Sequence, residues 1–187
     1  MAELATGHLK GVTNGAALVL GSGLGGGIII NGKLFQGSHF QAGELTFLLP
    51  LQMEKLDPSL MQGTTLSDIG LITKVNEILA SLDLKDGLLA FKAINAKKEA
   101  VYPIFETYCR NLAITILNLQ TIFDMETFVL GGGISAQSIL IEEVNRQFDK
   151  VHHEIDFIGK IIKRPKIVAC HHNGTNLIGA AYFLKQG

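Results

Sequence analysis

The stretch that most constrains the fold lies at residues 18–37 and reads LVLGSGLGGGIIINGKLFQG. An apolar run ends there at five glycines within seven positions, and a second apolar run follows at residues 28–30. Asn31-Gly32 then separates two β-prone segments, and this dipeptide favours a type I′ hairpin turn because both of its residues tolerate a positive φ. The pattern therefore predicts a glycine-rich turn between two strands, then a hairpin, with strands near residues 16–20, 26–31 and 33–36.

The glycine-rich turn has the composition of an anion site. Glycine lets the backbone approach a ligand closely, and consecutive N–H groups in such a turn form a concave site that suits a phosphate. Ser22 adds a hydroxyl donor. A tight turn without any ligand explains the same residues, and the composition leaves both interpretations open. The pattern is not that of a Walker loop, and a dinucleotide fingerprint would have to open a helix, whereas a strand is predicted here.

Composition limits the class of protein. A chain of 187 residues that is 47% hydrophobic and 18% charged is long enough for one domain, or one large lobe, with a substantial core. The net charge of -1 gives no electrostatic reason to expect nucleic-acid binding. Cys109 and Cys170 lack metal-ligand spacing and are expected to be reduced thiols of a cytoplasmic protein. No apolar run approaches the length of a membrane span.

Helical patterns dominate the middle of the chain. Ser67 or Asp68 can cap a helix, and Asp86 can cap a second one. A third, long helix is predicted from about residue 97 to residue 123, with Pro103 kinking or restarting it. Its apolar residues occupy more than one face, so either burial or an interface would explain them. Residues 2–10 also read as the tail of a helix, which suggests that a segment normally precedes them.

A second glycine cluster follows a predicted strand at residues 126–130. Gly131, Gly132 and Gly133 lead to Ser135, which is the predicted N-cap of the next helix, and a helix N-terminus can bind anions or polar ligand groups. A strand is expected at residues 166–169, and a final helix opens near residues 173–175.

Three polar residues outside the glycine clusters are candidate ligands. Glu44 lies between a glycine and an apolar run, where its carboxylate could accept hydrogen bonds from ligand hydroxyls or could simply be solvated. His171 and His172 are neighbours on an extended segment, so their side chains face opposite sides and cannot easily share one metal ion.

These motifs together resemble the ROK family (repressor, open reading frame, kinase). The resemblance rests on G-S-G-L-G-G-G between strands, the following N-G turn and A-G-E, then V-L-G-G-G-I-S at 129–135 and N-G-T-N-L-I-G-A-A at 173–181, in the family's order. It implies an α/β lobe of the actin-like ATPase (ribonuclease H-like) fold, in which a mixed sheet is covered by helices. Two such lobes close over ATP, with Mg²⁺, and a sugar.

The resemblance also assigns residues to the site. It implies that the first glycine turn faces the ATP phosphates, that the second borders the adenosine, and that Glu44 contacts the sugar hydroxyls. The ATP-binding residues expected in this way are Gly21, Ser22, Gly23, Gly25, Gly131, Gly132, Gly133 and Ser135.

The chain also departs from the family pattern. Family kinases carry a D-x-G-G-T-type phosphate loop and an Asn-Asp pair, whose Asp is the general base, upstream of the region matched here. No catalytic residue is therefore assigned within this chain. Many members also carry G-E-x-G-H followed by a zinc-binding cysteine cluster. Here residues 43–47 read G-E-L-T-F without that cluster, so no zinc is expected.

The sequence thus predicts that residues 1–187 form the C-terminal lobe of an ROK-type hexose kinase, without the N-terminal lobe and inactive by itself. The sugar-sensing lobe of an ROK repressor and a non-catalytic oligomerisation module are the alternatives. The apolar final helix and the long helix further predict a homodimer, with the long helix at or near the interface.

Overall fold

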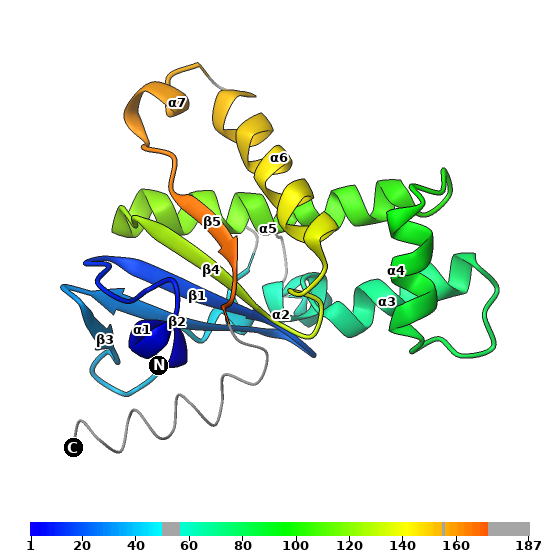
Figure 1. The fold of residues 1–187 in the computed structure, drawn as a ribbon, viewed down its shortest axis with the longest axis horizontal. Helices are drawn as coiled ribbons and strands as arrows, with labels where there is room; N and C mark the ends of the chain where they lie inside the picture. Colours follow the sequence, from blue (N-terminus) through cyan, green and yellow to red (C-terminus); the bar gives the residue numbers. More distant parts are fainter. Residues whose placement is uncertain (50–56, 155, 172–187) are drawn as a thin grey trace.

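A five-stranded mixed sheet organises the computed structural model, which describes residues 1–49, 57–154 and 156–171 (Figure 1). The strand order is β3-β2-β1-β4-β5. β1 pairs antiparallel with β2 and parallel with β4, β2 pairs antiparallel with β3, and β4 pairs parallel with β5. The strands are β1 (Gly15–Leu20), β2 (Leu24–Ile30), β3 (Lys33–Phe35), β4 (Thr127–Gly132) and β5 (Lys166–Ala169).

The five predicted strands are confirmed to within two residues at each end. The turn between β2 and β3 has the backbone that Asn-Gly predicts, because Asn31 has a φ of 52° and Gly32 a φ of 73°. This turn sets the register in which Ile30 lies opposite Lys33.

The two faces of the sheet have different coverings. Along β1, Ala16, Leu18 and Leu20 are buried on the face packed by α5 and α6, whereas Ala17 and Val19 point to the other face. This alternation follows from the two-residue period of a strand. The first face belongs to the main core. The second holds a small cluster under α1 that includes Leu9 and Val129, and Figure 1 shows α1 in front of the sheet with α5 behind it.

The helices begin where capping residues allow it. The Ser67 side chain accepts a hydrogen bond from the Gly70 N–H and caps α3, and Asp86 caps α4 through the Leu89 N–H. The main helices are α3 (Asp68–Ile78), α4 (Gly87–Asn95), α5 (Tyr102–Phe123) and α6 (Ser138–Glu154). The short ones are α1 (Ala2–Thr6), η1 (Leu45–Phe47), η2 (Pro58–Leu60), α2 (Gln62–Thr65) and α7 (Ile158–Ile161).

Two predicted helix boundaries are wrong. The long helix begins at Tyr102 rather than near residue 97, because Lys97 has a φ of 48° just after α4 and Pro103 then opens a new helix in its first turn. The first helix stops at Thr6, ahead of Gly7, instead of running to residue 10. The predicted final helix and His172 lie outside the described residues.

Burial within the domain explains the apolar stripe of α5. Its inward face packs against α6 and shares the main core with the sheet. The buried residues of this helix are Phe105, Tyr108, Cys109, Leu112, Ala113, Thr115, Ile116, Leu119 and Gln120. Burial raises the pKa of the Cys109 thiol far above its usual value, so this thiol is not reactive. Ile114 and Ile122 on α5 remain partly exposed.

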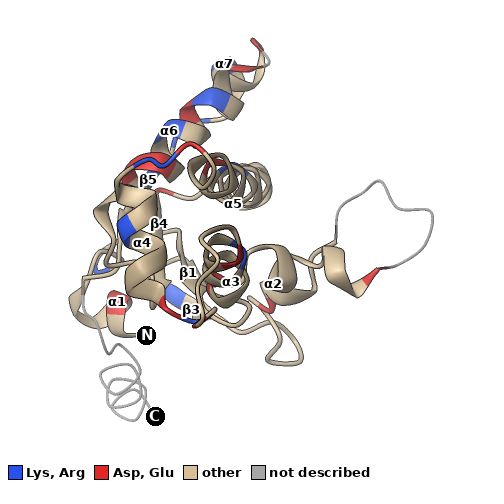
Figure 2. Cartoon of the chain, turned by 90° about the vertical axis from the view of Figure 1, so that its right-hand side faces the viewer, with Lys and Arg blue, Asp and Glu red and all other residues tan. Residues whose placement is uncertain are grey.

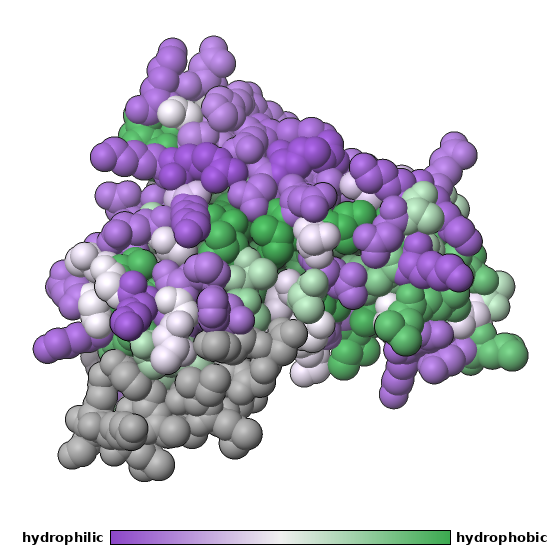
Figure 3. All heavy atoms as spheres, in the orientation of Figure 1, coloured by the Kyte–Doolittle hydropathy of each residue, from purple (hydrophilic) through white to green (hydrophobic). Residues whose placement is uncertain are grey.

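The described surface carries mixed charge and exposed apolar side chains. Basic and acidic residues alternate along α6 (Figure 2). Hydrophobic atoms gather over the hairpin of α3 and α4 (Figure 3). None of the described helices is long and apolar enough to cross a membrane.

The main core predicts a strong dependence on Phe128, which is fully buried in β4. Replacing Phe128 with Ala should lower the free energy of unfolding by about 3–5 kcal/mol, because the lost ring leaves a cavity. Phe157→Ala is the matched control, since Phe157 is 62% exposed, and it should cost under about 1 kcal/mol. Urea denaturation of the two variants measures both values, and equal losses would contradict the core described above.

Candidate functional site: two glycine turns at one edge of the sheet

The two glycine turns lie side by side. β1 and β4 are parallel neighbours, so their carboxyl ends meet at the same edge of the sheet. Val19 lies opposite Gly131, and Leu20 lies opposite Gly132. The prediction that both glycine clusters meet at one strand end is therefore confirmed. Ligands of α/β sheets commonly bind outside the carboxyl ends of such strands.

The first turn offers two successive backbone donors. The Gly21 N–H is used within the turn, where it donates to the Gly23 carbonyl at 3.1 Å, and the Gly21 carbonyl accepts from the Asp68 N–H at 2.9 Å. The N–H groups of Ser22 and Gly23 have no acceptor among the residues that the structure describes. Ser22 is also exposed. Two adjacent donors and a hydroxyl are thus available to an anion.

The glycines of this turn serve different purposes. A Cβ on Gly21 would have no atom within 4 Å, so open space lies beside this residue, and the surroundings of Gly25 are nearly as open. A Cβ on Gly23 would lie 2.9 Å from the Thr46 hydroxyl oxygen. That hydroxyl donates to the Leu24 carbonyl at 3.0 Å and accepts from the Leu24 N–H at 3.2 Å. Gly23 therefore makes room for Thr46, whereas Gly21 borders open space.

The second turn requires glycine at residue 132. Gly132 has a φ of 102°, and a Cβ there would overlap the carbonyl oxygen of Leu20. An L-residue is strained in this conformation. Gly133, which follows, is exposed at the edge of the sheet.

Ser135 does not cap a helix, contrary to the sequence prediction. α6 begins at Ser138, and the Ser135 hydroxyl instead donates to the Gly132 carbonyl at 2.8 Å. Ser135 is 1% exposed, and its oxygen lies 3.5 Å from the Cys170 sulfur. The buried Ser135 side chain therefore holds the second glycine turn in place from the interior of the protein.

Asp68 joins the two turns, which the sequence did not reveal. Its N–H binds Gly21 in the first turn, and its Oδ2 lies 3.3 Å from the place of a Cβ on Gly133 in the second. The residue is 9% exposed, and Oδ1 has no hydrogen-bond partner among the described residues. Burial raises the pKa of this carboxyl, although backbone N–H groups at Ile69 and at Asp68 itself partly oppose the shift.

Glu44 is held beside the first turn by its neighbours. It is exposed and precedes η1, which is fastened to the start of β2 by the Thr46–Leu24 hydrogen bonds. Gly43 has a φ of 92° and packs tightly against the backbone of Gly26 in β2. The Glu44 carboxylate is therefore placed on a loop whose base is fixed next to the glycine turn, with its oxygens open to solvent.

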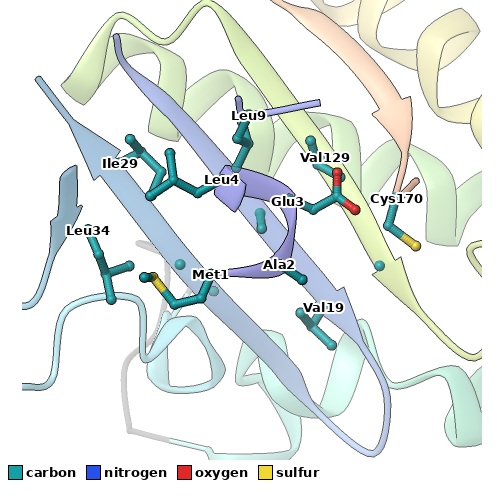
Figure 4. Close-up of a pocket in the computed structure, with 14 residues that line it drawn as sticks. Met1, Ala2, Glu3, Leu4, Leu9, Val19, Ile29, Leu34, Val129 and Cys170 are labelled. Carbon is teal, nitrogen blue, oxygen red and sulfur yellow. The ribbon is translucent and has the colours of Figure 1, made fainter. Parts of the chain in front are cut away.

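A hollow of about 270 Å³ lies on the other face of the sheet, under α1 (Figure 4). Of the predicted site residues that the structure describes, Gly131 alone lines it. Glu3, which also lines it, is 5% exposed, and its carboxylate accepts from the backbone N–H groups of His8 at 2.9 Å and His171 at 2.8 Å. These contacts fasten α1 to the end of β5, so Glu3 is satisfied by the protein itself.

No three His, Cys, Asp or Glu side chains within residues 1–49, 57–154 and 156–171 lie close enough together to hold a metal ion. The absence of bound zinc stays a prediction, which elemental analysis of the purified chain tests.

Comparison with known proteins shows which family the sequence matches. The profile of the ROK family matches residues 1–187. The N-acetyl-D-glucosamine kinase of Vibrio cholerae is 30% identical over 189 residues, which cover 95% of this chain and 60% of that protein. The chain thus spans about 60% of the length of this relative.

Solved structures share the fold over nearly the whole chain. A ROK family protein from Streptococcus pneumoniae in complex with sucrose is 28% identical with a TM-score of 0.81, covering 100% of this chain and 63% of that one. A ROK glucokinase from Streptomyces griseus in complex with glucose and AMPPNP is 23% identical with a TM-score of 0.81, covering 100% and 65%. A ROK transcriptional regulator, a homologue of the E. coli MLC protein, is 24% identical with a TM-score of 0.70, covering 98% and 48%.

The two adjacent glycines of β4 provide a matched test of this junction. Gly132→Ala should lower the free energy of unfolding by about 2 kcal/mol or more, because it combines a positive φ with overlap of the Leu20 carbonyl. Gly131→Ala should cost under about 1 kcal/mol, because the nearest atoms to a Cβ there lie at 3.9 Å. Thermal unfolding followed by circular dichroism compares the two variants. Equal losses of stability in the two variants would contradict the close contact between Gly132 and the Leu20 carbonyl.

Proposed function

The chain belongs to the ROK family, and on that premise we propose that it forms the nucleotide- and sugar-contacting lobe of an ATP-dependent hexose kinase. One observation carries the proposal: two glycine turns meet at the carboxyl ends of β1 and β4, with the N–H groups of Ser22 and Gly23 left for an anion. The relative from Vibrio cholerae is a sugar kinase, and the glucokinase of the same fold binds an ATP analogue, which supports this assignment.

Different residues would position different parts of the ligands. The N–H groups of Ser22 and Gly23 would donate to a phosphate, the second turn around Gly132 would border the adenosine, and Glu44 would accept hydrogen bonds from sugar hydroxyls. Phosphoryl transfer depends mainly on positioning and on stabilising charge. Mg²⁺ suits this arrangement without a protein cage, since it usually binds through one or two carboxylates, phosphates and water.

The general base would come from outside this lobe. The family resemblance places it upstream of the matched region, in an N-terminal lobe that closes over the same ligands. We therefore assign residues 1–187 to the C-terminal lobe and no catalytic residue to the chain.

The assignment of the general base to the N-terminal lobe can be tested by measuring activity. The 187-residue chain should bind ATP with Mg²⁺ but should not phosphorylate glucose, fructose, mannose or N-acetylglucosamine. Loss of a general base alone typically costs about 10²–10⁴-fold, and the loss of half of a phosphate site adds to this. Isothermal titration with AMPPNP measures binding, and a coupled assay measures turnover, with the Vibrio cholerae kinase as the positive control. Robust turnover that survives repurification would contradict the proposal.

The second candidate is the sugar-sensing lobe of a transcriptional regulator. The likeness to the ROK regulator favours it at the level of fold alone. A sensor needs the sugar site but not a phosphate site, so the free donors of Ser22 and Gly23 would then have no use. Binding of a hexose without any binding of AMPPNP would favour the regulator over the kinase.

We also propose that the lobe forms a homodimer, with its interface on the hairpin of α3 and α4. The long helix α5 uses most of its apolar side chains internally, whereas large apolar side chains stay exposed on the hairpin. These are Ile78, Leu82, Leu84, Leu88 and Leu89, with exposed fractions from 36% to 106%. Figure 3 shows hydrophobic surface over this hairpin. Exposed apolar clusters of this kind commonly mark interaction surfaces.

Charge insertion separates the two possible interfaces. Leu88→Glu should convert the dimer to a monomer, because it places a charge in the apolar hairpin surface, where Leu88 is 86% exposed. Ile122→Glu, at a site on α5 that is 69% exposed, should leave the dimer intact. Size-exclusion chromatography with light scattering reports the mass of each variant. A monomeric wild-type chain would refute the dimer, and dissociation by Ile122→Glu alone would move the interface to α5.

A further inference from the structure

Asp68 has an unusual environment for a carboxylate. It is 9% exposed, and Oδ1 has no hydrogen-bond partner among the described residues. The Tyr108 hydroxyl is committed elsewhere, since it donates to the Leu66 carbonyl at 3.1 Å. Buried acceptors normally have a partner, so this one calls for an explanation.

The fold does not need a charge at this position. Ser67 already caps α3, so Asp68 is not required as the cap. Its carboxylate gains something from lying in the first turn of the helix, where negative charge is favoured. Burial nevertheless raises its pKa, which means that the buried charge opposes folding. A residue that costs stability in the ligand-free protein is a candidate for a role in binding.

The position of Asp68 limits the ligand group that it can meet. Its N–H holds the first turn at Gly21, and its Oδ2 faces the second turn at Gly133. Under the proposed function, phosphates lie at the first turn and the base at the second, so the ribose falls between them. A carboxylate repels phosphate, but it accepts hydrogen bonds from hydroxyls, and acidic residues bind ribose hydroxyls in this way in dinucleotide-binding folds.

We propose that Asp68 is the acceptor for a ribose hydroxyl of the bound nucleotide, through its carboxylate, whose Oδ2 faces Gly133 at the junction of the two glycine turns. This inference rests on the proposed function, because it takes the nucleotide to lie across both turns. It makes the site selective for ribonucleotides over nucleotides that lack the contacted hydroxyl.

The test compares ATP with 2′-deoxy-ATP and 3′-deoxy-ATP, each with Mg²⁺, by isothermal titration of the 187-residue chain. The wild-type chain should bind ATP about 10-fold or more tightly than one of the two deoxy analogues, as expected for a hydrogen bond to a charged group. Asp68→Ala should bind ATP about 10-fold more weakly and should lose the preference. Asp156→Ala, which removes an exposed carboxylate, is the matched control and should behave as the wild type.

Each other outcome has a definite meaning. Equal binding of all three nucleotides by the wild type would overturn the ribose contact and leave the proposed function standing. No nucleotide binding by the wild type would overturn both. If Asp68→Ala weakens all three nucleotides equally and removes the dependence on Mg²⁺, Asp68 binds the cation instead, and the inference is wrong.

Asp68→Asn tests whether the role of Asp68 is purely structural, since the substitution keeps the shape of the side chain and removes its charge. The ligand-free variant should melt at or above the wild-type Tm at pH 7, because the raised pKa shows that the charged form is the costly one. Its preference for ATP should shrink, because a neutral amide oxygen is a weaker acceptor. A Tm lowered by several degrees with an unchanged preference would assign Asp68 to the fold and overturn the proposal.

Discussion

The close approach of Gly132 to the Leu20 carbonyl is the contact on which the candidate site depends. Only a residue without a Cβ, at a φ of 102°, lets β4 run alongside β1 to the last residue of each strand. The pairing brings two turns from opposite halves of the sequence to one edge of the sheet. Ser135 then holds the Gly132 carbonyl from the buried side, so the second turn is supported by the core. Sites built on such rigid elements keep their geometry without a ligand.

The strands could be predicted because their signals are local. The apolar runs, the glycines that end them and the Asn31-Gly32 turn each act within a few residues. The caps at Ser67 and Asp86 were also predictable, since a cap binds an N–H group three residues ahead. The start of α5 was not, because Lys97 takes a positive φ that no propensity favours, and the predicted Ser135 cap failed because its hydroxyl has a better partner in Gly132.

The candidate site was predictable only in part, because the sequence reveals local signals but not contacts between distant residues. Glycine spacing identified both turns, and parallel pairing brought them together. Thr46 and Asp68 were missed because their roles arise from contacts across more than 20 residues of sequence, with Leu24 and with Gly21 and Gly133 respectively. A threonine in a loop and an aspartate after a helix cap are ordinary in sequence. They become informative only when the fold shows what lies against them.

The junction of the two glycine turns combines backbone hydrogen-bond donors with a carboxyl group. The N–H groups of Ser22 and Gly23, which have no acceptor among the described residues, attract negative charge. The carboxylate of Asp68, whose N–H binds Gly21 and whose Oδ2 faces Gly133, repels it. An anion without hydroxyl groups would be attracted by the two N–H groups and repelled by the Asp68 carboxylate. A ligand that carries phosphate at one end and hydroxyl donors next to it satisfies both. Under the proposed function, this pairing of donors and an acceptor would favour a phosphorylated sugar, such as the ribose phosphate of a nucleotide, over phosphate alone.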